Sequence, residues 1–205
     1  MIMKKLKFLS VLFCCLAAMS FTSCDNGNDD VQSLTKEQIA QCFTTVKGTY
    51  TGKVIYTSIN PNNKNDVTDT LNIQWAVNTD STLVISKFPA KLLAQNINNT
   101  DLKTALSAAA DQDLTCYTGF TKTSPVTFLL NPVTLTYSLT YGGATHKVQV
   151  AFYINSYYSY GVYGSTVDSQ KLMQMQILEG AIYIDGNQST SLTSTVPFMF
   201  TGTKN

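Results

Sequence analysis

Regular alternation of apolar and polar residues is the sequence feature that most limits how this chain can fold. The clearest run is 133–141, where every second residue is apolar and threonine or serine fills the places between. Gly142-Gly143 then forms a hairpin turn signal, and the alternation resumes from Val148 to Ile154. A strand of this kind buries one face. The pattern therefore predicts sequential hairpins around one core.

Further strands are predicted at 50–58, 67–77, 82–87, 171–178, 181–185 and 192–203. This makes about eight or nine strands, most of them neighbours in the sequence. An antiparallel meander of that size must close on itself or form two layers, because open edges invite aggregation. We predict a mainly β fold with a closed or nearly closed antiparallel barrel. A two-sheet sandwich is the alternative.

Two helical segments are expected beside the strands. Thr35 and Gln38 have the spacing of a capping box, and Leu34 with Ile39 forms the matching hydrophobic staple. This first helix should end at Gly48. A second helix is predicted to begin with Thr100 as its N-cap, after one or two helical turns at 90–96, and to lie across an opening of the sheet.

The N-terminus has the pattern of an export signal. Lys4, Lys5 and Lys7 precede an apolar run at 8–20, which is shorter than the roughly 20 residues that a membrane span needs. We predict a signal peptide at 1–23, lipidation of Cys24, a flexible tether at 24–33 and a single β domain at 34–205. The alternative is an ordinary signal peptide in which Cys24 stands by chance.

Three motifs carry a resemblance to a known group of proteins. The segment Phe21-Thr22-Ser23-Cys24 resembles a lipobox, the acidic run 25–30 is similar to a surface-export signal, and 48–52 reads Gly-Thr-Tyr-Thr-Gly at the start of the first strand. Together they resemble the uncharacterised outer-membrane lipoproteins of Bacteroides and relatives, and their calycin-like (lipocalin-like) members. The resemblance implies a membrane-anchored protein at the cell surface. The alternative for the acidic run is a simple solvated linker. The alternative for the location is a protein that faces the periplasm.

Composition argues against several functions. The chain has no arginine, and its 14 lysines nearly balance 13 acidic residues, so a nucleic-acid partner is not expected. Only two glutamates, Glu37 and Glu179, and one histidine, His146, are present. No G-x-S-x-G, HExxH or paired CxxC motif occurs. We predict no catalytic residues, metal or cofactor. An envelope hydrolase is the alternative, and His146 beside an aspartate and a serine would favour it.

A tyrosine-rich segment is the most unusual local feature. Tyr157, Tyr158, Tyr160 and Tyr163 lie among serine and glycine residues, soon after Tyr153. We predict that 157–163 is a loop whose four rings bind a ligand, because tyrosine offers a rigid apolar face and a hydroxyl group. The alternative is that the rings cover one end of the barrel. The predicted function is a non-catalytic binding module for a glycan, a small apolar ligand or a protein partner.

Cys42 and Cys116 are the cysteines that remain beyond Cys24 after removal of the signal peptide. An exported protein meets an oxidising compartment, so a disulfide between them is one prediction. Two buried free thiols are the other, because Cys42 lies on the apolar face of the first helix.

Overall fold

The computed structural model describes residues 33–59, 66–155, 157–167 and 170–205. The predicted signal peptide, Cys24 and all of the predicted tether except Ser33 lie outside these residues. The first helix is α2 (Lys36–Val46), and its capping box is confirmed, since Thr35 and Gln38 each bond the other's backbone N–H. No helix among the described residues is long and apolar enough to cross a membrane.

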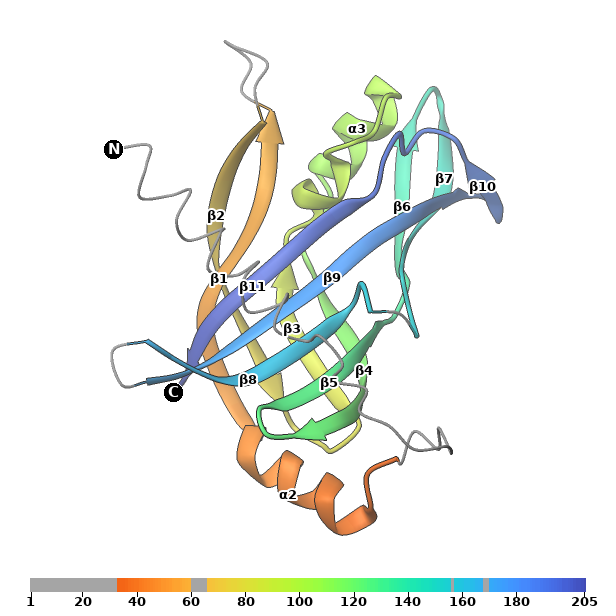
Figure 1. The fold of residues 1–205 in the computed structure, drawn as a ribbon. Coiled ribbons are helices and arrows are strands. Elements are labelled where there is room, and N and C mark those ends of the chain that lie inside the picture. The colour runs from red at the N-terminus through yellow and green to blue at the C-terminus, as the bar shows by residue number, and fades with distance from the viewer. Residues whose placement is uncertain (1–32, 60–65, 156, 168–169) are drawn as a thin grey trace, which may run out of the picture. The chain divides into compact units, whose positions relative to one another are not determined.

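Eight strands of the described chain form a closed antiparallel barrel, as predicted (Figure 1). Its wall runs in the order β11-β1-β2-β3-β4-β5-β8-β9, and β9 pairs with β11 to close the ring. The strands are β1 (Gly48–Ile59), β2 (Asp66–Val77), β3 (Thr82–Phe88), β4 (Gln112–Thr123), β5 (Val126–Pro132), β8 (Tyr160–Val167), β9 (Gln170–Ile184) and β11 (Val196–Lys204).

The remaining strands extend the wall at one end. The hairpin of β6 (Leu135–Tyr141) and β7 (Ala144–Phe152) pairs with the second half of β9, and β10 (Asn187–Ser189) pairs with β9 from its other side. The register of β7 against β9 shifts between Ala151 and Phe152, which marks a β-bulge. Bulges reset which side chains point inward. Strand β9 therefore belongs to the barrel in its first half and to the extension in its second.

Helices lie at both ends of the barrel (Figure 1). Helix α2 contacts β4 and β5, while α3 (Thr100–Ser107) contacts β6 and the short helix η1 (Ala90–Ala94). The N-cap of α3 is Asn99, one residue before the predicted Thr100, because the Asn99 side chain accepts the N–H of Leu102. Asn and Thr are both good N-caps, so the sequence alone did not distinguish them.

A polar latch fastens the η1–α3 connection to the loop before β11. The side-chain amide of Asn96 donates to Ser194 Oγ at 2.8 Å and to the Thr195 carbonyl at 3.3 Å. In return the Asn96 carbonyl accepts from both the N–H and the hydroxyl of Thr193, each at 2.9 Å. We call this contact the Asn96 latch.

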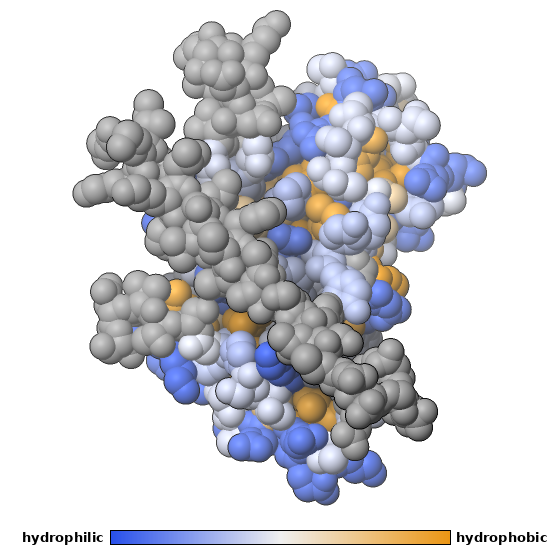
Figure 2. Space-filling model, viewed as in Figure 1, coloured by the Kyte–Doolittle hydropathy of each residue, from blue (hydrophilic) through white to orange (hydrophobic). Residues whose placement is uncertain are grey.

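The protein's own aromatic side chains fill the interior of the barrel. Tyr50 stacks on Trp75 with ring centroids 5.7 Å apart, and Trp75 meets Phe200 edge-on at 6.2 Å. Phe88 continues the row to Phe198 at 5.2 Å. Most large apolar side chains are buried in this core, and on the described part of the face in Figure 2 hydrophobic residues show as separate areas among hydrophilic ones.

Candidate functional site

The exposed aromatic residues between β7 and β8 form the most prominent surface feature. Tyr157 is 82% exposed and Tyr158 is 58% exposed, and Tyr153 and Ile154 are also exposed. The rings of Tyr153 and Tyr158 meet edge-to-face with centroids 5.6 Å apart. We call Tyr153, Ile154, Tyr157 and Tyr158 the tyrosine cluster.

Backbone contacts fix the tyrosine cluster to the barrel wall. Buried Ser159 donates its hydroxyl to the Tyr153 carbonyl at 2.8 Å, and its own carbonyl accepts from the Leu130 N–H at 2.9 Å. The side chain of Gln176 donates to the Tyr158 carbonyl at 3.0 Å. These bonds hold the backbone of Tyr153, Tyr158 and Ser159 against the wall.

A second tie joins the cluster to β5. Asn155 and Asn131 make two hydrogen bonds, from the Asn155 N–H to Asn131 Oδ1 at 2.6 Å and from Asn131 Nδ2 to Asn155 Oδ1 at 2.9 Å. Asn155 has a positive φ of 50°, a conformation that asparagine tolerates better than most residues. The two bonds therefore tie Asn155, which follows Ile154 of the cluster, to β5.

Two of the four predicted tyrosines do not belong to this cluster. The predicted loop at 157–163 is wrong after Ser159, because β8 begins at Tyr160. Tyr163 points into the barrel, is buried and meets Tyr50 edge-on at 6.1 Å. Tyr160 lies on the alternate face of β8 and is half-buried, and burial raises its pKa to about 12.

A glycine explains why β8 is a strand despite its sequence. Gly161 faces the ring of Phe128 on β5, and a Cβ atom there would overlap that ring. The glycine thus allows close packing between the neighbouring strands β5 and β8 and does not break the strand. This is a long-range contact, so it could not be seen in the local pattern.

Glu179 is a buried carboxyl group that the sequence analysis did not select. Its side chain is fully buried, and neither carboxylate oxygen has a hydrogen-bond partner among the described residues. Its cross-strand neighbours are Phe152 and Val196, both apolar. Burial raises the pKa of Glu179 well above its ordinary value. The sequence did contain a signal for this burial. Glu179 has the same strand parity as the apolar residues Met173, Met175 and Ile177, which predicts that it points to the same buried face.

Tyr137 on β6 contributes a second unsatisfied polar atom in the same region. Its hydroxyl is buried and has no hydrogen-bond partner in the described part of the chain. Burial raises the pKa of Tyr137 to about 12, and the negative charges of Asp111 and Glu179 add to the increase. Two buried polar groups thus lie close enough to influence each other, yet the protein leaves both unpaired.

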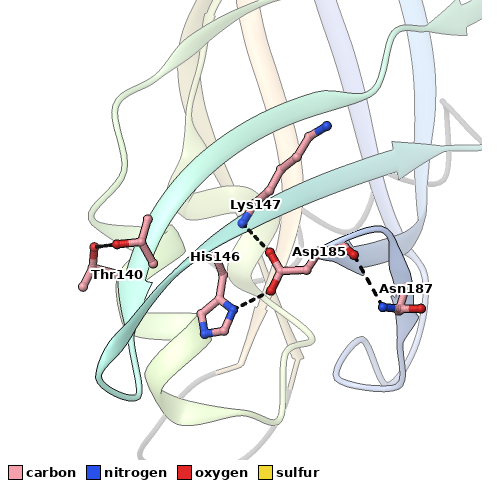
Figure 3. Close-up of polar contacts among 6 residues, drawn as sticks. Thr140, His146, Lys147, Asp185 and Asn187 are labelled. Atoms are coloured by element: carbon pink, nitrogen blue, oxygen red, sulfur yellow. Dashed lines mark hydrogen bonds and ion pairs between the residues drawn. The ribbon is translucent and has the colours of Figure 1, made fainter.

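His146 lies beside an aspartate, as a hydrolase would require, but the arrangement is incomplete. Its Nδ1 is 2.7 Å from Asp185 Oδ2, and the other carboxylate oxygen of Asp185 accepts the Lys147 N–H at 2.9 Å (Figure 3). The bond to His146 is the main cause of a lowered pKa at Asp185. Among the described residues, no Ser, Thr or Cys side chain hydrogen-bonds to the His146 ring.

The predicted disulfide is not formed, and both thiols are free and buried. Cys42 Sγ lies 3.7 Å from the Lys122 carbonyl near the end of β4, whereas Cys116 is six residues back along that strand. Six strand residues span about 20 Å, far more than a disulfide can bridge. Burial raises the pKa of both thiols, that of Cys116 to about 12. The described residues contain no group of His, Cys, Asp and Glu suited to a metal ion.

Comparison with known proteins gives a family without an assigned role. No curated protein matches the chain. The crystal structure of the ywiB protein from Bacillus subtilis is similar at 7% identity, covering 79% of this chain and 97% of that one, with a TM-score of 0.28. The model of a family described as a domain of unknown function, DUF4840, matches residues 45–184, which include most of the barrel, the tyrosine cluster and Glu179. The chain belongs to the DUF4840 family.

Proposed function

We propose that this protein is a non-catalytic binding module of the cell envelope that holds a glycan through the tyrosine cluster. The same proposal places it in the outer membrane at the cell surface, anchored by a lipid on Cys24. Support for the anchor comes from the sequence, namely the signal pattern at 1–23 and the polar run that follows Cys24. The lipobox-like segment also supports a relationship to Bacteroides-type, calycin-like lipoproteins.

The observation that carries the proposal is the exposure of Tyr157, at 82%, beside Tyr158, whose carbonyl accepts a hydrogen bond from Gln176 on the barrel wall. Large aromatic rings that remain exposed in a group mark interaction sites more often than single apolar residues do. Rigid tyrosines contribute contact area at a low entropy cost.

A glycan suits this surface better than a small apolar ligand does. Sugars present both apolar C–H faces and hydroxyl groups, and the exposed Tyr157 and Tyr158 each carry a ring and a hydroxyl group. A small apolar ligand would need space inside the barrel, where aromatic side chains pack on one another. Each ring supplies on the order of 1 kcal/mol, so binding should be weak and should benefit from many copies on one membrane.

Substitution of the exposed rings tests this proposal. Tyr157→Ala and Tyr158→Ala should each weaken binding to a glycan found in a panel screen by about five-fold, the equivalent of about 1 kcal/mol. Tyr157→Phe keeps the ring and should retain most of the affinity, which makes it the matched control. Unchanged glycan binding by both alanine variants would refute the proposal.

An envelope hydrolase is the alternative, and the contact between His146 and Asp185 favours it. In such an enzyme the aspartate would orient the imidazole as a general base. A screen of ester and glycoside substrates would decide between the two functions. Hydrolysis that is lost in His146→Ala, with the fold intact, would replace the binding proposal.

A further inference from the structure

We propose that the binding surface extends from the tyrosine cluster across β5 to Tyr117 on β4 and takes a linear, uncharged glycan chain of several sugars. This inference rests on the proposed function and names the class of glycan that the surface fits. Six large apolar side chains are exposed among the described residues, and four of them form the tyrosine cluster. The other two are Tyr117 and Val133. We call all six together the aromatic strip.

The first step is that Tyr117 lies opposite the residue that fastens the tyrosine cluster to the wall. In the pairing of β4 with β5, Tyr117 is the direct partner of Asn131, so the two side chains lie on the same face. Asn131 makes two hydrogen bonds with Asn155, which directly follows Ile154 of the cluster. One asparagine therefore links the two parts of the aromatic strip.

Tyr117 and Val133 lie on the outer side of the wall. The residues before them, Cys116 and Pro132, are buried, whereas Tyr117 is 58% exposed and Val133 is also exposed. The Val133 N–H donates to the Thr115 carbonyl at 2.8 Å, which fixes this segment beside β4. Both side chains are therefore presented to solvent by hydrogen-bonded backbone.

The second step concerns the length of the aromatic strip. At the end away from Tyr117, the ring of Tyr153 lies over Gly180 on β9, where a Cβ atom would be 2.6 Å from that ring. Strands β5 and β8 separate β4 from β9 in the wall, so the strip spans about 14 Å at the usual spacing of strands. A single sugar ring is shorter than this span. A chain of several sugars therefore fits the strip better than a monosaccharide does.

The third step concerns charge. The stretches 114–121, 126–145 and 148–167, which carry the aromatic strip, contain no Asp, Glu or Lys, and the chain has no arginine. An acidic glycan would need cations here to offset its charge. Neutral hydroxyl groups need only ordinary donors and acceptors, such as the tyrosine hydroxyl groups and the exposed Asn155 side chain. The strip therefore favours an uncharged glycan.

Affinity should increase with the number of sugars until the aromatic strip is covered. Each exposed ring that stacks on a sugar should strengthen binding by about five-fold. A disaccharide covers the tyrosine cluster alone, whereas a longer chain also reaches Tyr117.

Oligosaccharides of two lengths test the inference by isothermal titration on the full chain. The neutral probes are cellobiose with cellohexaose and β-1,4-mannobiose with β-1,4-mannohexaose, and hexagalacturonate is the charged probe of the same length. In at least one neutral series the hexasaccharide should bind at least about five-fold more tightly than the disaccharide. Hexagalacturonate should bind more weakly than that hexasaccharide.

Tyr117→Ala should weaken binding of the neutral hexasaccharide by about five-fold and leave binding of the disaccharide unchanged. Tyr117→Phe keeps the ring and is the matched control, which should retain most of the affinity. Tyr157→Ala should weaken binding of both lengths. The exposure of Tyr117 means that its loss should not disturb the fold, and an unchanged melting temperature would check this.

The outcomes separate this inference from the proposed function. Equal affinity for the two lengths, tighter binding of hexagalacturonate, or hexasaccharide binding that survives in Tyr117→Ala would each overturn the inference. Glycan binding that still depends on Tyr157 would then leave the proposed function standing. If none of the oligosaccharides binds, the inference is wrong, and if no glycan of the panel binds either, the proposed function is wrong as well.

Discussion

At the scale of single residues, Glu179 should control how stability depends on pH. Its pKa is raised in the folded protein, so the folded state holds a proton that the unfolded state releases above about pH 4.5. The contribution of Glu179 to stability is therefore most favourable below that pH and falls as the pH rises toward the folded pKa, by at most about 1.4 kcal/mol per pH unit. Tyr137 and Asp111 are the charged or titratable groups coupled to this region.

Glu179→Gln should remove this pH dependence and raise the free energy of unfolding at neutral pH. Urea denaturation at several pH values between 5 and 8 would measure both effects. Glu37→Gln provides the control, because Glu37 is exposed and its pKa is lowered by hydrogen bonds to its own backbone N–H and to Thr35. A wild type whose stability rises steadily from pH 5 to 8 would contradict the expected role of Glu179.

The two thiols make a second prediction at the residue scale. A soluble version of the chain that begins at Asp25, unfolded without reductant, should release two reactive thiols, those of Cys42 and Cys116. In the native protein both should react slowly, since burial raises the pKa of each and the thiolate is the reactive form. Detection of fewer than two thiols after unfolding would mean that a bond forms which the structure lacks.

At the scale of elements, the Asn96 latch holds the helical segment on the end of the barrel. Asn96→Ala removes the side-chain donor to Ser194 and Thr195 and should reduce the free energy of unfolding by about 1–2 kcal/mol. Asn98→Ala is the matched control, because Asn98 bonds the Ser191 carbonyl through its backbone N–H, which the substitution keeps. Its effect should stay within about 0.5 kcal/mol. Equal denaturation midpoints for the two variants would show that the Asn96 latch does not stabilise the helical segment.

At the scale of the whole molecule, the close approach of β1 and β11 in the barrel wall requires a pair of glycines. Gly52 on β1 faces Gly202 on β11, and a Cβ atom at Gly202 would lie 2.5 Å from the Trp75 ring and 2.6 Å from the Thr51 carbonyl oxygen. Gly202→Ala should therefore destabilise the fold by about 3 kcal/mol and lower its melting temperature by several degrees.

Gly119→Ala on β4 is the control for this experiment, because a Cβ atom there meets nothing within 4 Å. Thermal melts followed by near-ultraviolet circular dichroism would report the packing of Trp75 directly. A melting temperature for Gly202→Ala that equals the wild-type value would mean that β1 and β11 can separate without cost.

The sequence by itself determined the local elements. The capping box at Thr35 and Gln38 set the start of α2, the Gly142-Gly143 turn set the β6–β7 hairpin, and alternation identified most strands. The strands β4, β5 and β8 were not identified. Much of β4 is exposed or half-buried and its pattern is weak, Leu129 interrupts the apolar–polar alternation of β5, and Gly161 and Gly164 made β8 resemble a loop. These features depend on contacts between near neighbours, which a local pattern records.

Only the tertiary structure decided what depends on distant pairing. Closure as a barrel and not a sandwich rests on β9 pairing with β11, and the inward position of Tyr163 rests on β8 joining β5 and β9. The sequence shows that Glu179 shares the parity of the buried residues of β9. It does not show that β7 and β11 pair with β9 at this position and bury the side chain. Cys42 and Cys116 remain apart because helix α2 lies at the far end of β4. In each case the stabilising contacts join residues that are far apart in the sequence, so a local sequence pattern does not predict them.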